Sequence, residues 1–441
     1  MPPPPLHLLD LLRLRGLFHQ STDEAALRIH LAQPRRLYNG FDPTADSLTI
    51  GNLVPIMLMR RFRAFGHEPV VLMGGATGRI GDPSGKDAER TLLSDERVEA
   101  NIAGQRPIFL ALLGEETPIV DNHDWFRDIS FLDALRDIGK HFSVNEMIRR
   151  DAVRNRLERD GQGISYTEFS YMLLQAYDFL HLYRARGVTI QTAGADQWGN
   201  IVSGVDLIRR AHGHAPDSSP LAFGFTAPLL TKSDGGKFGK TEAGAVWLSH
   251  HRPSGAAGTS PYAYFQFWLN TADADVRRYL LIFTDLEVRQ IDDLCARHAA
   301  VPHERAAQLT LAREATALLH GPAAMRAAEA AGAALFSGEV ASLDLATLEE
   351  VFAAVPSTEH RRDDLTRPGA AGDGIALVDL LPLTSLCKSK REAREHLAAG
   401  AVTLNGRPVG PEDRLQEGRL LHGALALLRR GKKAWHVTRW K

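Results

Sequence analysis

Residues 38–52 read YNGFDPTADSLTIGN, and residues 237–241 read KFGKT. The first stretch is typical of a strand that ends in a glycine turn and opens a helix, where free backbone N–H groups can receive phosphate. The second stretch places two ammonium groups in a glycine-flanked loop, where they can neutralise the charge of a triphosphate. Either stretch alone is a weak indication, because most loops rich in Gly and Lys are simply solvated.

Strand-and-turn patterns recur along the chain. Residues 53–65 predict a helix that ends at Gly66. The apolar run at residues 70–73 is closed by two glycines, and residues 188–192 precede Ala193-Gly194 in the same way. Such runs are typical of buried parallel strands. Strands that alternate with helices predict an α/β fold with a Rossmann-like parallel sheet, which binds ligands at the carboxyl ends of its strands.

The rest of the chain is predicted mainly from its periodicity. Residues 6–33 look helical, with an apolar stripe of leucines, and residues 260–337 are helical and rich in Ala and Arg. Residues 389–397 predict a basic helix, and residues 401–409 predict a strand followed by a tight Asn-Gly hairpin turn. These patterns divide the chain into a catalytic α/β domain (1–250), an α-helical domain (260–352), a linker (353–373) and a small α+β domain (374–441).

Composition bounds the class of protein. A chain of 441 residues is too long for one ordinary core, so two or three domains are expected. Hydrophobic content of 44% and charged content of 24% are those of a soluble globular protein. The net charge of −1 hides a basic end, because residues 374–441 contain 13 Lys or Arg and 6 Asp or Glu. A basic end suggests a polyanionic partner, and charge alone leaves a solvated tail equally open.

Several kinds of site are excluded or disfavoured. Only Cys295 and Cys387 are present, which excludes a disulfide framework and a zinc site built on cysteines. The glycines of residues 75–81 lack the spacing of a dinucleotide-binding turn, and Gly85-Lys86 lacks the other residues of a P-loop. The paired histidines have no apparent third ligand, so no metal site made of side chains is expected. Neither a signal peptide nor a run long enough for a membrane helix is evident.

A polar stripe stands out between residues 169 and 180. Tyr171, Gln175 and Asp178 fall at i, i+4 and i+7, so they share one face of a helix. Their neighbours are apolar, and we therefore expect the stripe to line an enclosed space. Periodicity leaves open the alternative that the stripe is solvated or satisfies its own hydrogen bonds.

In this order and with this lettering, the two stretches resemble the signature motifs of class I aminoacyl-tRNA synthetases. The polar stripe is similar to the tyrosine-binding helix of tyrosyl-tRNA synthetases of the bacterial type. The resemblance runs from about Leu12 to the C-terminus, and residues 389–409 resemble an S4-type RNA-binding module. It implies a Rossmann-like catalytic domain, an α-helical anticodon-binding domain and an S4-like tRNA-binding domain.

The resemblance also implies where the amino acid would bind. Asp178 and Tyr38 would hydrogen-bond the phenolic hydroxyl of tyrosine, so phenylalanine would leave both of them buried and unpaired. A carboxylate nearby would compensate the charge of the α-ammonium group. The residues implied to hold the α-ammonium and carboxyl groups are Asp82, Tyr171, Gln175 and Gln197.

ATP would lie against the two signature motifs. Asp196 would accept a hydrogen bond from the ribose, and the alternative is that it only caps the helix after it. The residues implied to bind ATP are Gly40, Asp42, Gly51, Gly194, Asp196, Lys237, Phe238, Gly239, Lys240 and Thr241. The residues implied to act in catalysis by positioning and charge stabilisation are Thr44, Thr49, Asn52, Lys86, Arg90, Lys237 and Lys240.

The chain departs from the family pattern at three places. The first motif usually reads His-Ile-Gly-His and here reads Thr-Ile-Gly-Asn at residues 49–52. Asn52 keeps a donor amide and Thr49 a hydroxyl on a shorter arm, so the site is expected to remain active. Asn39 stands where the family more often has Cys. Residues 252–258, rich in Pro, Ser, Gly and Ala, replace a shorter connection, and the sequence assigns them no function.

The implied activity is that of an ATP-dependent tyrosine–tRNA ligase, which forms tyrosyl-adenylate and then transfers tyrosine to the 3′-terminal adenosine of tRNA(Tyr). The implied partners are L-tyrosine, tRNA(Tyr) and ATP with Mg²⁺, without a tightly bound cofactor, membrane or DNA. A cytoplasmic homodimer is expected from the family alone. Two rivals stay open: a tryptophanyl-tRNA synthetase, whose substrate has no phenol, and a non-catalytic RNA-binding paralogue, which the loss of both histidines motivates.

Overall fold

The computed structural model describes residues 6–441 except 83–92, 151–152, 155–156, 158–162, 214–218, 237, 242–243, 354, 367–373 and 432–433. Of Lys240, Thr241 and Phe336 it describes the backbone alone. The chain forms two compact units. The first consists of Met1–Thr259 and Trp268–Leu319, and the second of Ser260–Phe267 and His320–Lys441.

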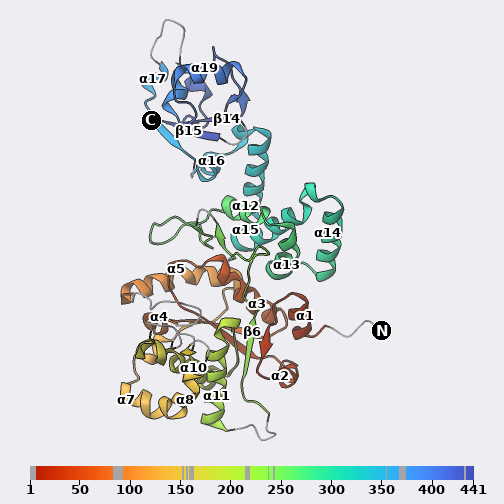
Figure 1. Ribbon diagram of the computed structural model, residues 1–441, viewed down its shortest axis with the longest axis vertical. Helices are drawn as coiled ribbons and strands as arrows, with labels where there is room; N and C mark the ends of the chain where they lie inside the picture. Colours follow the sequence, from red (N-terminus) through yellow and green to blue (C-terminus); the bar gives the residue numbers. More distant parts are fainter. Residues whose placement is uncertain are drawn as a thin grey trace. The chain divides into compact units, whose positions relative to one another are not determined.

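A six-stranded sheet forms the centre of the first unit (Figure 1). Its strands lie in the order β1-β6-β5-β2-β3-β4, with β1 antiparallel to β6 and the other five parallel. Their bounds are β1 Gln20–Ser21, β2 Arg36–Phe41, β3 Glu68–Met73, β4 Ile119–Asp121, β5 Val188–Gly194 and β6 Phe223–Ala227. The predicted Rossmann-like parallel sheet is therefore confirmed.

Helices cover both faces of this sheet. Tyr38 packs against Phe179 with ring centroids 5.4 Å apart, and Phe41 packs against Phe109 at 4.7 Å. Tyr38 and Phe41 are an odd number of residues apart in one strand, so they point to opposite faces. Phe179 belongs to α10 and Phe109 to α5. The helices that begin and end in Met1–Thr259 are α1 Leu8–Leu14, α2 Glu24–His30, α3 Leu53–Ala64, α4 Thr77–Ile80, α5 Asp95–Leu113, α6 His123–Phe126, α7 Phe131–Asp133, α8 Val144–Ile148, α10 Tyr166–Arg186 and α11 Trp198–His212.

The N-terminal segment differs from its prediction. Residues 6–33, expected to be helical throughout, form the two short helices α1 and α2 with strand β1 between them. Gly16, with φ of 69°, turns the chain after α1, and β1 then pairs with β6. Asp23 caps α2 by accepting a hydrogen bond from the backbone N–H of Ala26 at 2.9 Å. The leucine stripe belongs to α1 alone.

Residues 260–337 are helical, as predicted. They form α12 Pro261–Leu269, α13 Asp273–Phe283, α14 Val288–Ala300 and α15 Ala306–Ser337. Helix α15 is kinked at Gly321, which has φ of 85° and precedes Pro322, and the two units divide just before this kink. In the part of the chain that the structure describes, no helix combines the length and apolar character that crossing a membrane requires.

The second unit contains a five-stranded sheet in the order β12-β11-β14-β15-β9. The hairpin turn predicted within residues 401–409 is confirmed, because Asn405 and Gly406 have φ of 50° and 83° between β11 and β12. The basic helix predicted over residues 389–397 is α19. The remaining bounds are α16 Leu345–Val351, β9 Ser357–His360, α17 Asp363–Thr366, β10 Ile375–Ala376, α18 Leu377–Leu380, α19 Lys390–Ala398, β11 Val402–Leu404, β12 Arg407–Pro408, β13 Arg414–Leu415, β14 Leu425–Arg430 and β15 Ala434–Trp440.

The prediction of a linker over residues 353–373 is wrong in its central part, which forms a strand and a short helix. Strand β9 lies parallel to β15 at the edge of the sheet, with Ser357 opposite Val437, and α17 follows it. The segment Ser357–His360 has no apolar alternation, so the pairing with β15 rather than local sequence makes it a strand. Residues 367–373 lie outside the described residues.

Candidate active site

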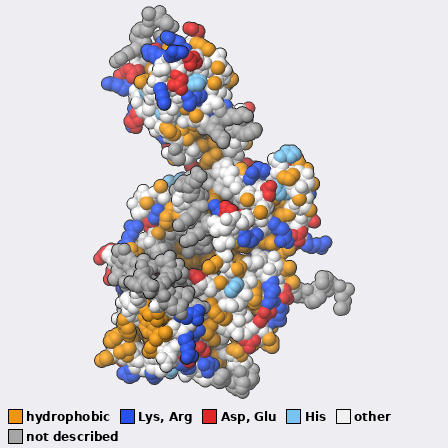
Figure 2. Space-filling model, in the orientation of Figure 1, with side chains coloured by type: hydrophobic (Ala, Val, Ile, Leu, Met, Phe, Trp, Pro, Cys, Tyr) orange, Lys and Arg blue, Asp and Glu red, His pale blue; other side chains and the backbone are white. Residues whose placement is uncertain are grey.

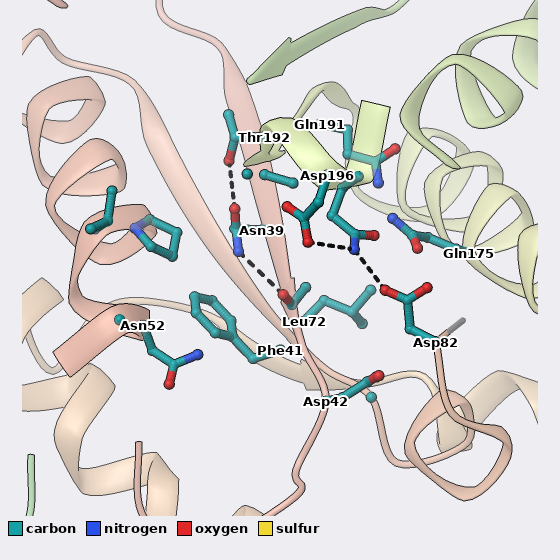
Figure 3. Close-up of a pocket in the computed structure, with 18 of the residues that line it drawn as sticks. Asn39, Phe41, Asp42, Asn52, Leu72, Asp82, Gln175, Gln191, Thr192 and Asp196 are labelled. Atoms are coloured by element: carbon teal, nitrogen blue, oxygen red, sulfur yellow. Dashed lines mark hydrogen bonds between the residues drawn. The ribbon is translucent and has the colours of Figure 1, made fainter. Parts of the chain in front are cut away.

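A cavity of about 650 Å³ opens at the carboxyl ends of strands β2, β3 and β5, where the parallel sheet predicts a ligand site. The polar stripe of α10 supplies another wall. Of the residues singled out from the sequence, those lining this cavity are Tyr38, Asn39, Gly40, Asp42, Thr44, Gly51, Asn52, Asp82, Tyr171, Gln175, Asp178, Gly194, Asp196, Gln197 and Phe238. Side chains from distant parts of the sequence thus face one space (Figure 3).

Tyr38 and Asp178 are deeply buried groups of the cavity wall, at 1% and 2% exposure. The Asp178 carboxylate accepts hydrogen bonds from Nε1 of Trp125 at 3.0 Å and Nδ2 of Asn122 at 3.1 Å. Burial raises the pKa of Asp178 well above its ordinary value, although these two hydrogen bonds act in the opposite direction. Among the described residues, the hydroxyl of Tyr38 has no hydrogen-bond partner. A phenolic hydroxyl between these two groups would complete both sets of hydrogen bonds.

Asn122 and Trp125 were not singled out from the sequence. They follow β4, so the position of their segment at the carboxyl end of a strand is the signal that could have located them. That strand has only three residues and is partly exposed, which makes the signal faint.

A second polar group lies on the side of the cavity formed by α10 and the loop after α4. Nε2 of Gln197 donates to Asp82 at 2.6 Å and, more weakly, to Asp196 at 3.4 Å. The hydroxyl of Tyr171 donates to Asp42 at 3.3 Å. Oε1 of Gln175 is buried and has no partner within the described part of the chain. Figure 3 shows Asp82, Gln175 and Asp196 turned toward the same space, which suits a small cationic group.

Asp196 does not cap the helix that follows it. The N-cap position of α11 is Gln197, and its side chain makes no capping hydrogen bond. Asp196 instead lines the cavity, and burial raises the pKa of its carboxyl group. The alternative that the sequence left open for Asp196 is thus disfavoured.

The first signature motif forms a short 3₁₀ turn, Ile50–Asn52, that opens α3. The backbone N–H and the hydroxyl of Thr49 both donate to Oδ1 of Asn52, each at 3.0 Å. Two donors on one oxygen fix the orientation of the amide, so Nδ2 of Asn52 faces the cavity (Figure 3). Thr49 itself is not part of the cavity wall, because its short side chain is turned toward Asn52.

The second signature motif packs directly on the first. Gly239 has φ of 82°, and a Cβ atom there would lie 2.5 Å from Cγ2 of Ile50. The ring of Phe238 stacks on Phe283 of α13, with centroids 5.4 Å apart. Lys86, Arg90 and Lys237 lie outside the described residues, and Lys240–Thr241 is described only as the backbone of strand β7.

One group with metal-ligand chemistry occurs in the described chain, and it lies in the second unit. Cys387, Glu392 and His396 bring their ligand atoms within 4.8 Å of one another. The guanidinium of Arg430 lies beside two of them, 2.9 Å from Glu392 and 3.2 Å from His396. Arg430 thus already supplies the positive charge that a metal ion would supply.

Two family models match the chain. A family model described as tRNA synthetases class I (W and Y) matches residues 31–337, and one described as tyrosine–tRNA ligase SYY-like C-terminal domain matches residues 347–438.

Relatives match over nearly the whole chain. It is 47% identical to the tyrosine–tRNA ligase of Geobacillus stearothermophilus, covering 99% of this chain and 100% of the relative. It is 48% identical to that of Aeromonas hydrophila subsp. hydrophila, covering 99% of each. A C-terminally truncated mitochondrial tyrosyl-tRNA synthetase from Coccidioides posadasii has a similar structure, with a TM-score of 0.63, 32% identity and coverage of 73% of this chain and 90% of that one. The chain belongs to the class I tRNA synthetases and, within them, to the tyrosine–tRNA ligase family.

Proposed function

We propose that this protein joins L-tyrosine to tRNA(Tyr) at the expense of ATP, and that it binds tyrosine in the cavity between β2 and α10. The observation that carries the proposal is the buried pair of Tyr38 and Asp178 at one end of a cavity whose wall also contains both signature motifs. The pair suits a phenol, and the glycine turn of the first motif suits a phosphate.

In the first step, the carboxylate of tyrosine attacks the α-phosphate of ATP, and pyrophosphate leaves with the electron pair of the broken P–O bond. The carboxylate is already ionised, so the step needs no general base. Asp82, Tyr171 and Gln175 orient the α-ammonium group, and Gln197 the carboxyl region. Asn52 and Thr44 donate hydrogen bonds to phosphate, and Lys86, Arg90, Lys237 and Lys240 neutralise the leaving group. Mg²⁺ enters with ATP as part of the substrate.

In the second step, the terminal ribose hydroxyl of tRNA(Tyr) attacks the carbonyl carbon of the adenylate and AMP leaves. The helical region 260–352 contacts the anticodon arm, and the small α+β part from residue 374 onward binds tRNA phosphates. Exposed basic side chains at the start of α19 support this role: Lys388, Lys390, Arg391 and Arg394. We place the reaction in the cytoplasm, as the resemblance to bacterial-type tyrosyl-tRNA synthetases implies.

ATP–pyrophosphate exchange tests the proposal. Exchange that depends on L-tyrosine, and not on L-tryptophan, is the expected result. Exchange driven by tryptophan would instead identify the first rival, and no exchange with either amino acid would identify an RNA-binding paralogue.

Asn52 is expected to provide the phosphate donor that the family usually takes from histidine. Replacing Asn52 with alanine should lower kcat of pyrophosphate exchange about tenfold or more, because a lost hydrogen bond to a charged group is worth about 1.5–3 kcal/mol. Asn52→His should stay within about threefold of the wild type, since it restores a donor. The kcat of Thr49→Val should lie between those of the two Asn52 variants, because the change removes the hydroxyl that orients the Asn52 amide and keeps the amide itself. An alanine variant with unchanged kcat would remove Asn52 from the reaction.

We also propose that the protein is a homodimer and that the partner covers α7, α8 and the helical segment 134–141 between them. Figure 2 shows hydrophobic side chains gathered over these helices. The exposed members are Phe131, Leu132, Leu135, Val144 and Ile148, with exposures of 65%, 75%, 42%, 58% and 41%. A contiguous apolar surface of this kind is typical of a contact between proteins.

Leu132→Arg should therefore halve the mass measured by light scattering during gel filtration, because a buried unpaired charge at an interface costs several kcal/mol. Ile29→Arg is the matched control, since Ile29 is also exposed, at 77%, and lies away from this patch on α2. Equal masses for the Leu132 variant and the wild type would exclude this surface as the contact.

A further inference from the structure

The segment that follows the second signature motif runs alongside the first motif. The N–H of Ile50 donates to the carbonyl of Val246 at 2.9 Å, and the N–H of Leu248 donates to the carbonyl of Leu48 at 2.8 Å. Thr49 and Trp247 form the bridge between these hydrogen bonds. Residues 246–249 thus form an antiparallel pair with residues 47–50, which precede the turn that carries Asn52.

One end of this pairing reaches the second motif itself. The N–H of Val246 also donates to the carbonyl of Gly239, at 3.1 Å. Gly239 in turn packs against Ile50, with no room for a side chain between them. The position of each signature motif therefore depends on the same short ladder.

The other end of the pairing is fixed by a buried ion pair. Nε and a terminal nitrogen of Arg252 donate to Oδ1 of Asp46, the first at 2.9 Å, and the N–H of Ser254 donates to Oδ2 at 2.8 Å. The side chains of Asp46 and Arg252 are 1% and 11% exposed. The guanidinium also lies 4.0 Å from the ring centroid of Trp247, a cation–π contact.

Hydrogen bonds and ion pairing keep Asp46 charged. Burial would raise the pKa of Asp46, but the hydrogen bonds from Ser254 and Arg252 outweigh it and lower the pKa to about 2. Removing one partner of a buried ion pair is strongly destabilising, because it leaves the other charge buried without compensation.

Arg252 and Ser254 belong to the stretch 252–258, which is rich in Pro, Ser, Gly and Ala and to which the sequence assigns no function. This stretch is a compact hairpin: His251 bridges to Ala257, and the N–H of Gly255, which has φ of 75°, donates to the carbonyl of Arg252 at 2.9 Å. A Cβ atom at Gly258 would lie 2.2 Å from the carbonyl oxygens of Ser249 and His250, so the hairpin closes tightly on its own base.

We propose that Arg252 is a positioning residue, and that the hairpin 252–258 holds the two signature motifs in register for the triphosphate by anchoring Asp46. The proposal rests on the proposed function of the site. The tyrosine end of the cavity is built from β2 and α10. The hydrogen bonds and the ion pair that Arg252 and Ser254 form with Asp46 involve neither of these elements. Loss of the anchor therefore affects turnover with ATP and leaves tyrosine binding intact.

Arg252→Ala tests this role in the full-length protein. It should lower kcat of tyrosine-dependent pyrophosphate exchange by about 10- to 100-fold, since a displacement of about 1 Å can cost about 100-fold. KM for tyrosine should stay within about twofold of the wild-type value, because β2 and α10, which form the tyrosine end of the cavity, are unchanged. Arg252→Lys keeps the charge but not the forked donors, and should give an intermediate kcat. Arg277→Ala is the matched control: it breaks an exposed ion pair with Asp292 in the same unit and should leave kcat unchanged.

Amide hydrogen exchange gives a readout that does not depend on activity. Arg252→Ala should speed exchange at Leu248 and Ile50 at least about tenfold, while amides of α10 keep the wild-type rate. Unchanged exchange at Leu248 and Ile50, or a rise in KM for tyrosine that matches the fall in kcat, would overturn the proposal. If the wild-type protein shows no tyrosine-dependent pyrophosphate exchange, the proposed function is contradicted. The amide hydrogen-exchange rates would then decide by themselves whether Arg252 anchors the hairpin. If the alanine variant does not fold, the lysine variant decides by the same two measurements.

Discussion

Replacing Asp178 with alanine is expected to remove most of the discrimination between tyrosine and phenylalanine. Asp178 and Tyr38 are buried in the cavity wall at 2% and 1% exposure, and a substrate without a phenolic hydroxyl would leave both of them without that hydrogen-bond partner. A buried polar group left unpaired costs about 1–3 kcal/mol, and more when charged. The ratio of kcat/KM for tyrosine to that for phenylalanine should fall about 100-fold or more, mainly through a lower value for tyrosine.

Tyr38→Phe should lower the same ratio by a smaller factor, because it removes one donor and leaves the carboxylate. Tyr166→Phe serves as control, since Tyr166 lies on the same helix as Asp178 but is 63% exposed. The measurement is pyrophosphate exchange with each amino acid. Unchanged selectivity in both the Asp178 and the Tyr38 variant would contradict the assignment of the pocket.

Shortening the chain after Leu319 is expected to separate the two chemical steps. The cut lies where the two compact units divide and leaves the cavity residues in place. A cut at residue 374 would instead leave β9 without β15, its partner in the five-stranded sheet. Charging of tRNA should fall about 100-fold or more, because the cut removes the basic side chains that we propose to bind tRNA phosphates. Pyrophosphate exchange should change by less than about threefold, since adenylate formation needs no tRNA contact.

A gentler change tests the same surface without removing it. The double variant Arg391→Ala/Arg394→Ala should weaken tRNA binding and reduce the slope of its salt dependence by about 2, as the loss of two phosphate contacts predicts. Equal loss of charging and pyrophosphate exchange in the shortened chain would show that the second unit also supports the catalytic cavity.

Much of the fold and the cavity could be predicted because their signals are local. The parallel strands show as short apolar runs closed by glycine, and the spacing of Tyr171, Gln175 and Asp178 places them on one helical face. The Asn405-Gly406 turn has a strong hairpin preference of its own. In each case the physical cause lies within about ten residues, so one sequence is enough to show it.

Other features depend on contacts between distant segments, which one sequence does not display. Strand β9 exists because β15 offers it an edge, and Trp125 reaches Asp178 from a short helix more than fifty residues before it. Thr49 turned out to orient Asn52, because a threonine too short to reach the cavity still meets the amide of its own turn. The pairing of Arg252 with Asp46 crosses about two hundred residues and could not be predicted from composition.

The hydroxyl of Tyr38, which has no hydrogen-bond partner in the described part of the chain, connects substrate selectivity with thermal stability. A core in which this hydroxyl were matched or removed would be more stable in the absence of amino acid, yet it would be expected to distinguish tyrosine from phenylalanine less well. Adaptation toward higher growth temperature is thus constrained at this position, since the simplest stabilising change, Tyr38→Phe, would increase mistranslation of tyrosine codons.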